Sequence, residues 1–182
     1  MKKKTNVLVG VCAGIAAYKT CELVRLLVKD EYSVKIVMTP DAANFVTPLT
    51  FQTLSGTGVY KDMFFDLESG VLKHISLSDW ADICAVVPVT ANTISKLAHG
   101  ICDNLLTTVI TALDKNKPVI LAPAMNVNMW QNSIIQENVE KLKRYEKFTV
   151  LETLKGELAC GVTGYGRMLE PSDIFKKIKS KL

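Results

Sequence analysis

The chain has 182 residues, of which 48% are hydrophobic and 22% are charged, and its formal net charge is +4. This length and balance predict one globular domain, residues 1–182, and argue against disorder. The sequence has no basic stripe with interleaved aromatics, which argues against nucleic acid as a partner. No apolar run approaches the ~20 residues that cross a bilayer. Five cysteines without a CxxC pair indicate neither a disulfide framework nor a zinc site. We therefore expect a reduced, cytoplasmic protein without membrane segment or metal.

Strands and helices alternate along the sequence. Runs rich in Val and Ile predict strands buried on both faces, as in a parallel sheet, at 6–12, 33–39, 82–88, 118–123 and 148–152. Helical spacing fills the intervals at 14–30, 90–116 (one or two helices), 133–146 and 171–182. This order predicts an α/β three-layer sandwich with a mostly parallel, Rossmann- or flavodoxin-like sheet. The charged and then apolar start fits a strand, a turn and a helix better than a signal peptide.

In such sheets ligands bind beyond the carboxyl ends of the strands, so the loops that follow the strands are the candidate sites. After the first strand, a turn bearing Gly10 and Gly14 leads into a helix that is expected to begin near Gly14. Free N–H groups there suit an anion, although a merely tight turn is equally consistent. After the second strand, Thr39 offers a hydroxyl, and Phe45 suits either a planar ligand or the core.

The loop after the third strand places Thr90, Asn92 and Thr93 at the start of a helix. These residues serve as caps or as a cradle for phosphate or polyol oxygens. Further along, Cys102, Asp103 and Asn104 interrupt an apolar helix and could form a second polar junction.

The stretch PAMNVNMW (123–130) follows the fourth strand. Its Met and Trp side chains can shape an apolar wall, because thioethers adapt to flat or irregular surfaces. Asn126 carries both a donor and an acceptor, so it could hold a carboxylate or an amide, or satisfy its own loop. We expect Asn128 to cap the following helix.

Two further residues are candidates for proton transfer. Cys160 begins the glycine-rich part of the stretch 154–171, which has the character of a lid or clamp carrying a thiol. A lone cysteine is more often an inert small residue. His74 lies in the irregular middle of the chain and is a candidate neutral-pH base, although a lone histidine is usually structural.

These features coincide in a way that resembles the homo-oligomeric flavin-containing cysteine decarboxylases. The resemblance covers nearly the whole chain and rests on GVCAGIAAYK, His74 in KHISLSDWAD, PVTANTISKLAHGICDNLL, PAMNVNMW and LACGVTGYGRM, in that order. PAMNVNMW matches the family's PxMNxxMW signature, and ACGVTGYGRM matches its substrate clamp. Within the family, the chain is similar to members that act on phosphopantothenoylcysteine in coenzyme A biosynthesis.

The resemblance implies roles for individual residues. It implies FMN contacts at Ala13, Gly14, Ile15, Thr39, Ala42, Phe45, Thr90, Ala91, Asn92, Thr93, Ala124 and Met125. It also implies His74 as the active-site base, Asn126 as the contact of the substrate carboxylate and Cys160 as the proton donor. Met129 and Ala159 would line the substrate site beside them.

The implied reaction makes phosphopantetheine without net redox change. The flavin oxidises the CH2–SH unit of the substrate to a thioaldehyde, CO2 leaves to give an ene-thiolate, and re-reduction yields the thiol. The family also implies a homotrimer or a multiple of trimers, with His74 contributed across an interface. Many bacteria fuse the decarboxylase to a ligase, and we expect that second activity to be absent here.

Three alternatives on the same fold stay open. A peptidyl-cysteine decarboxylase shares PxMNxxMW and differs chiefly in the clamp. A flavin prenyltransferase binds FMN, but the combination of His74, PxMNxxMW and the clamp cysteine argues against it. A non-catalytic FMN-binding regulator usually carries a long acidic tail, which is not found in this sequence.

Overall fold

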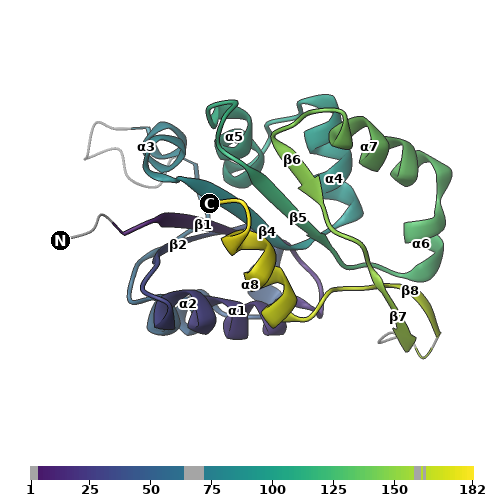
Figure 1. Ribbon diagram of the computed structural model, residues 1–182, viewed down its shortest axis with the longest axis horizontal. Coiled ribbons are helices and arrows are strands. Elements are labelled where there is room, and N and C mark those ends of the chain that lie inside the picture. Colours follow the sequence, from purple (N-terminus) through teal and green to yellow (C-terminus); the bar gives the residue numbers. More distant parts are fainter. Residues whose placement is uncertain (1–3, 64–71, 158–160, 162) are drawn as a thin grey trace.

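The computed structural model describes residues 4–63, 72–157, 161 and 163–182 (Figure 1). Its central sheet has six strands, ordered β3 (Val59–Tyr60), β2 (Ser33–Met38), β1 (Asn6–Val11), β4 (Ile83–Val89), β5 (Val119–Pro123) and β6 (Phe148–Val150). Every neighbouring pair in this sheet is parallel. The order 3-2-1-4-5-6 is that of the Rossmann fold, which confirms the predicted α/β class.

Helices cover both faces of the sheet (Figure 1). One face carries α1 (Ala17–Lys29), α2 (Pro48–Ser55) and α8 (Pro171–Lys179). The other carries α3 (Lys73–Trp80), α4 (Ala91–His99), α5 (Leu105–Ala112) and α7 (Ser133–Lys143). The short helices η1 (Pro40–Asn44) and α6 (Val127–Gln131) follow β2 and β5. The three layers are those predicted from the alternation of strands and helices.

The period-two alternation of a strand divides the core between these two helical layers. Val7, Val9 and Val11 of β1 join the cluster beneath α1, α2 and α8, whereas Leu8 joins the cluster beneath α4, α5 and α7. At Gly10 a Cβ would lie 2.6 Å from a methyl group of Leu106, so a larger residue would displace this side chain, and the close packing of α5 on β1 favours glycine. Because both faces are buried, the strands are continuous apolar runs.

Segments for which the sequence predicted neither a helix nor a strand contain additional structure. The stretch 39–75 holds η1, α2, β3 and the start of α3. The clamp stretch forms an antiparallel hairpin of β7 (Leu154–Glu157) and β8 (Thr163–Arg167), which extends beyond the carboxyl edge of the sheet (Figure 1). The predicted segment 90–116 is two helices, and the first helix begins at Ala17 rather than near Gly14.

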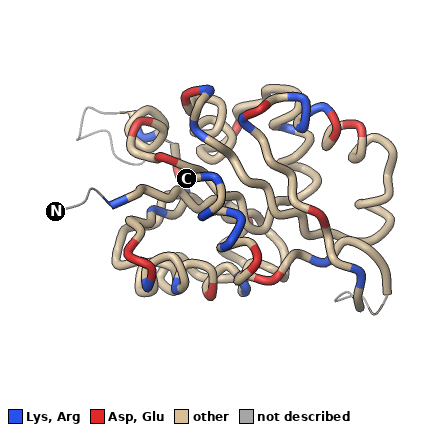
Figure 2. The backbone as a smooth tube through the Cα atoms, viewed as in Figure 1, with Lys and Arg blue, Asp and Glu red and all other residues tan. Residues whose placement is uncertain are grey.

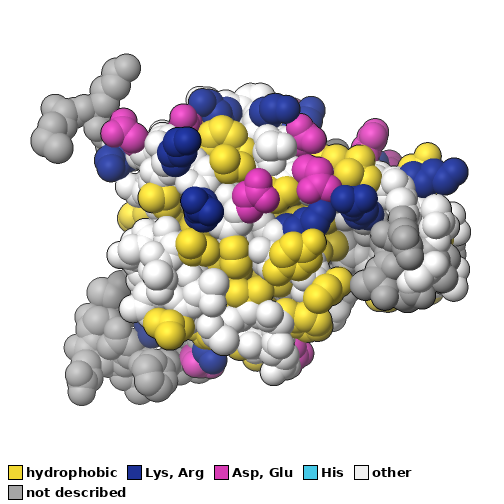
Figure 3. Space-filling model, turned by 90° about the horizontal axis from the view of Figure 1, so that it is seen from below, with side chains coloured by type: hydrophobic (Ala, Val, Ile, Leu, Met, Phe, Trp, Pro, Cys, Tyr) yellow, Lys and Arg dark blue, Asp and Glu magenta, His cyan; other side chains and the backbone are white. Residues whose placement is uncertain are grey.

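Charged residues lie mainly on the helices and connections, while the strands of the central sheet carry few (Figure 2). On the face formed by α1, α2 and α8, hydrophobic side chains are exposed between charged ones (Figure 3). Ile15, Tyr18, Phe45 and Leu49 are exposed large hydrophobics of this part of the chain. Within the described residues, no helix is both long and apolar enough to cross a membrane.

Candidate active site

The site lies where the loops after β1 and β4 separate, at the topological switch point of the sheet. The connections of β1 and β4 run to opposite faces there, which leaves a crevice beyond the strand ends. Backbone hydrogen bonds tie each loop to a neighbouring strand or loop: Thr39 N–H to Val11 O at 2.9 Å, Cys12 N–H to Pro88 O at 3.2 Å and Ala124 N–H to Val89 O at 3.2 Å. The floor of the crevice is therefore fixed by the sheet itself.

The larger of two pockets in this crevice has a volume of about 670 Å³ and is called the main pocket below. It is lined by Ala13, Gly14, Ile15, Ala16, Tyr18, Lys19, Thr90, Ala91, Ala124, Met125, Asn126, Met129, Gly166, Arg167 and Met168. Nine of these fifteen are residues for which the sequence predicted a flavin or substrate contact. The structure thus brings the loops after β1, β4 and β5 together around one space.

A second pocket of about 240 Å³, called the polar pocket, adjoins the main pocket and shares Ala13 and Thr90 with it. It is lined by Ala13, Thr39, Pro40, Asp41, Thr90, Asn92, Thr93, Lys96, Asp103 and Asn104. Three hydroxyl, two amide and two carboxylate side chains and one ammonium group form most of this lining. Alanine and methionine are the commonest residues of the main pocket. The two pockets together offer one apolar and one polar compartment.

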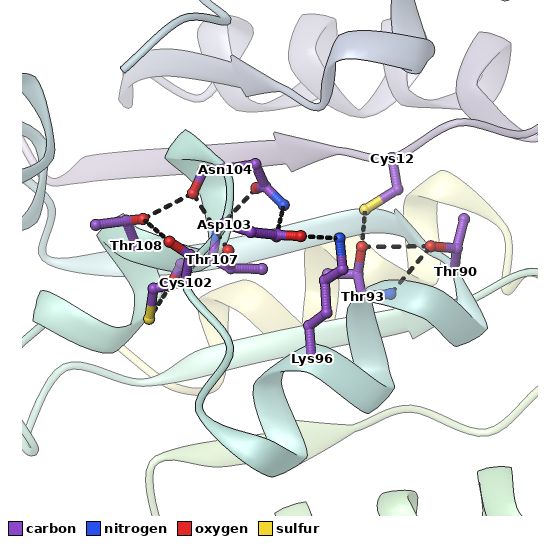
Figure 4. A network of polar contacts seen from close by, with 9 residues as sticks. All are labelled: Cys12, Thr90, Thr93, Lys96, Cys102, Asp103, Asn104, Thr107 and Thr108. Atoms are coloured by element: carbon purple, nitrogen blue, oxygen red, sulfur yellow. Dashed lines mark hydrogen bonds and ion pairs between the residues drawn. The ribbon is translucent and has the colours of Figure 1, made fainter. Parts of the chain in front are cut away.

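Hydrogen bonds order the polar pocket at the start of α4 (Figure 4). Thr90 is the N-cap of α4, and its hydroxyl accepts from the backbone N–H of Thr93 at 3.3 Å. The Thr93 hydroxyl also lies 3.2 Å from the Cys12 sulfur. Burial raises the pKa of the Cys12 thiol, so this sulfur is a neutral packing group beneath the pocket.

An ion pair closes the other side of the polar pocket. Lys96 Nζ lies 2.7 Å from Asp103 Oδ2, and the Asn104 side chain donates to Asp103 Oδ1 at 3.0 Å (Figure 4). The hydrogen bond from Lys96 lowers the pKa of the Asp103 carboxyl. The predicted polar junction at Asp103 and Asn104 and the predicted Thr90 cradle therefore line the same pocket. Lys96, which pairs with Asp103, also lines it and was not singled out from the sequence.

Asn126 lies at the entrance of α6 and lines the main pocket. It is the N-cap of this helix, and its Oδ1 accepts from the backbone N–H of Asn128 at 2.8 Å. The expectation that Asn128 is a cap was wrong, because Asn128 lies inside α6 and Asn126 caps it. The capping bond fixes the orientation of the Asn126 amide beside the pocket.

The β7–β8 hairpin closes the main pocket from the side. The N–H of Met125 donates to the carbonyl oxygen of Gly166 at 3.0 Å, and a Cβ at Gly164 would lie 2.7 Å from a methyl group of Val127. The hairpin therefore docks on the PAMNVNMW loop through glycines, which permits the close backbone approach. This position agrees with a clamp, as predicted for the stretch 154–171.

Known proteins resemble the chain throughout. The model of the Flavoprotein family matches residues 1–182. The chain belongs to this family. The bifunctional coenzyme A biosynthesis protein CoaBC of Bacillus subtilis is 46% identical over 176 residues, which are 97% of this chain but 43% of that protein. The chain thus spans less than half the length of such relatives. The probable phosphopantothenoylcysteine decarboxylase of Streptococcus mutans is 38% identical over 182 residues, all of both chains.

Solved structures extend the likeness to three dimensions. A mutant PPC decarboxylase complexed with pantothenoylaminoethenethiol superposes with a TM-score of 0.87 at 33% identity, covering 98% of both chains. The FMN binding protein AtHal3 superposes with a TM-score of 0.83 at 33% identity, covering 98% of this chain and 96% of its own. The Rossmann-like arrangement of this flavoprotein is therefore that of its solved relatives.

Some residues predicted for the site of this flavoprotein line neither pocket. Ala42 is fully buried in the core beneath α1 and α2, and Phe45 at the end of η1 is 48% exposed. His74 is half-buried near the start of α3. Helix α3 lies at the end of the molecule opposite the hairpin (Figure 1). Ala159 and Cys160 lie outside the described residues.

Two charged residues of the main pocket were missed by sequence reasoning. Lys19 lies in the first turn of α1, four residues after Ile15, and Arg167 ends β8 within the clamp motif. Ile15 lies in the turn before α1, so its four-residue spacing to Lys19 gave no helical signal, and the orientation of Lys19 depends on Glu170. Arg167 gave no separate signal, because its place in the pocket depends on the docking of the hairpin.

Proposed function

We propose that this flavoprotein catalyses the FMN-dependent decarboxylation of phosphopantothenoylcysteine to phosphopantetheine, as a carboxy-lyase of coenzyme A biosynthesis. The observation that carries the proposal is the main pocket, which joins seven of the twelve predicted flavin contacts, Asn126 and the clamp hairpin in one space. Relatives named for this reaction or for its pathway support the substrate. Residues 1–182 would form a single decarboxylase domain, which we expect to work in the reducing cytoplasm.

The two compartments suit FMN in particular. The polar pocket offers hydroxyls of Thr39, Thr90 and Thr93 and the amino-terminal N–H groups of α4, which are donors that a phosphate accepts from. The main pocket offers apolar surface from Ile15, Met125 and other residues for a planar ring. Lys96 would add a positive charge beside the phosphate, shared with Asp103.

When bound, FMN would supply a hydride acceptor and donor, which gives the substrate the electron sink that decarboxylation requires. Asn126 would orient the cysteinyl carboxylate by hydrogen bonds from its amide. The hairpin would cover the substrate and exclude water. His74 would accept a proton from the substrate, and Cys160 would protonate the ene-thiolate carbon at the end of the reaction.

We also infer a homotrimer or a multiple of trimers. His74 lines neither pocket, and α3, which carries it, lies at the opposite end of the molecule from the hairpin (Figure 1), so a base at position 74 would serve a site on another copy. Mixing inactive His74→Asn and Asn126→Asp variants should then restore part of the activity, since some mixed sites receive both intact residues. A protein that is monomeric by light scattering and yet fully active would contradict the proposed trimer.

The reaction itself is tested with purified protein, FMN and phosphopantothenoylcysteine. Mass spectrometry should show conversion to a product that has lost CO2, and omission of protein is the control. Cys160→Ser should still release CO2 but accumulate the ene-thiol product. Protein that binds no FMN, or an FMN-loaded protein that leaves the substrate intact, would refute the proposed function.

A further inference from the structure

The main pocket carries an unbalanced charge. Among the described residues that line it, Lys19 and Arg167 are the charged ones, and both are cations. Lys19 comes from the first turn of α1 and Arg167 from the end of β8, so two distant segments of the chain bring positive charge to one space. The Lys19 side chain is only 15% exposed.

Glu170 holds these two cations together. Lys19 Nζ donates to both carboxylate oxygens of Glu170 at 3.0 Å, and Arg167 Nη2 donates to Oε1 at 2.7 Å. Glu170 is the N-cap of α8, yet its side chain makes no capping bond. The carboxylate faces Lys19 and Arg167 instead, although it does not itself line the pocket.

The cluster of Lys19, Arg167 and Glu170 has a net charge of +1 and presents its two cations toward the pocket. An arginine and a lysine held by one carboxylate are already oriented, so little side-chain entropy remains to be lost when an anion binds. A phosphate monoester has several acceptor oxygens and about two negative charges, which matches such a pair. A carboxylate held by neutral Asn126 would occupy a different part of the same pocket.

We propose that Lys19 and Arg167 form a subsite for the phosphate monoester of the substrate and that Glu170 is the positioning residue that holds both cations. This inference rests on the proposed function, because it assigns one end of the proposed substrate. The subsite discriminates in favour of a phosphorylated pantothenoyl chain. The pair belongs to the main pocket alone and is distinct from the polar pocket proposed for the FMN phosphate.

The test compares two substrates that differ only in the phosphate, phosphopantothenoylcysteine and pantothenoylcysteine. The FMN-loaded wild type should show a higher kcat/KM for the phosphorylated substrate. Lys19→Gln and Arg167→Gln should each reduce this preference about 10-fold or more, because each removes a charge-assisted hydrogen bond. Lys29→Gln is the matched control, since Lys29 lies in the last turn of the same helix and is exposed.

Titration calorimetry of the same proteins with 4′-phosphopantothenate and pantothenate tests binding without catalysis. It therefore also gives a result for a variant that has lost its activity. The subsite is supported if Lys19→Gln or Arg167→Gln weakens the binding of 4′-phosphopantothenate but leaves the binding of pantothenate unchanged. Equal use of both substrates by the wild type, or equal losses on both in the variants, would overturn it and leave the proposed reaction intact. A wild type that decarboxylates neither substrate would refute the proposed function, and the calorimetry would then decide on the subsite.

Discussion

The N–H of Met125 donates a hydrogen bond to the carbonyl oxygen of Gly166 at 3.0 Å, joining the loop after β5 to the β7–β8 hairpin. Both residues line the main pocket, so this bond sets the distance between the wall that carries Asn126 and the clamp. Gly166 has φ +134°, and a Cβ there would collide with the Met125 carbonyl oxygen. The glycine is required by both backbone conformation and close approach.

Gly166→Ala should separate the hairpin from the loop. The added methyl group must displace the Met125 carbonyl, and the positive φ is strained for alanine, which together cost about 1–3 kcal/mol. We expect a lower melting temperature and weaker substrate binding in titration calorimetry. Gly58→Ala is the control, because no atom lies within 4 Å of a Cβ at Gly58. Equal stability of the two variants would contradict the docking of the hairpin.

Substitutions at Asn126 can separate its role as a cap from its proposed role toward the substrate. Asn126→Asp retains an N-cap oxygen for the N–H of Asn128, so α6 and the melting temperature should be preserved. A carboxylate at this position repels the substrate carboxylate, so kcat/KM should fall by about 100-fold or more. Asn126→Ala also loses the cap, at about 1 kcal/mol in stability. An active Asn126→Asp enzyme would refute the carboxylate contact.

The four central strands could be predicted from sequence because they are buried on both faces, whereas the edge strand β3 is only partly buried and was missed. Each strand that was predicted ends within two residues of its observed end. Helices cover both faces of the sheet, so residues on both faces of a strand are apolar and the run is continuous in sequence. The hairpin could not be predicted in this way. Its strand TGYGR has no alternating pattern, and its position depends on contacts with Met125 and Val127, which are distant in sequence from β8.

Helix α3 was missed because its sequence, like that of the hairpin, has no regular apolar pattern. Its buried residues are Leu77 and Ser78, while Ile75 is exposed, so the apolar residues do not form one stripe. The site was predictable from the loops that follow the strand ends, as with Gly14 and Thr90, which both line the main pocket. Lys19 was not predicted as a pocket residue, because its orientation depends on Glu170, 151 positions further along the chain.

The cysteines should differ sharply in reactivity. Burial raises the pKa of the Cys12 thiol and raises that of Cys84 to about 12, so neither forms a thiolate at neutral pH. Cys102 is exposed. Brief treatment of the native protein with iodoacetamide, followed by peptide mapping, should label Cys102 and leave the two buried thiols unmodified. Labelling of all three after denaturation is the control, and native labelling of Cys12 would contradict its burial beneath the polar pocket.

The Glu170 cluster predicts how stability depends on pH. The hydrogen bond from Lys19, followed by the charges of Lys19 and Arg167, lowers the pKa of the Glu170 carboxyl below its usual range. A carboxyl whose pKa is lower in the folded state stabilises the protein above its unfolded pKa, about 4.3, and this contribution is lost as pH falls through the folded value.

Glu170→Gln should therefore lower the melting temperature near pH 7, and its difference from wild type should shrink as the pH falls below about 4. Differential scanning calorimetry across this range measures the effect. Glu22→Gln, an exposed position on α1, is the matched control and should differ little from wild type at any pH. A Glu170→Gln difference that grows on acidification would mean that the carboxylate does not stabilise the cluster. Lys19 and Arg167 would then be held in place by other contacts.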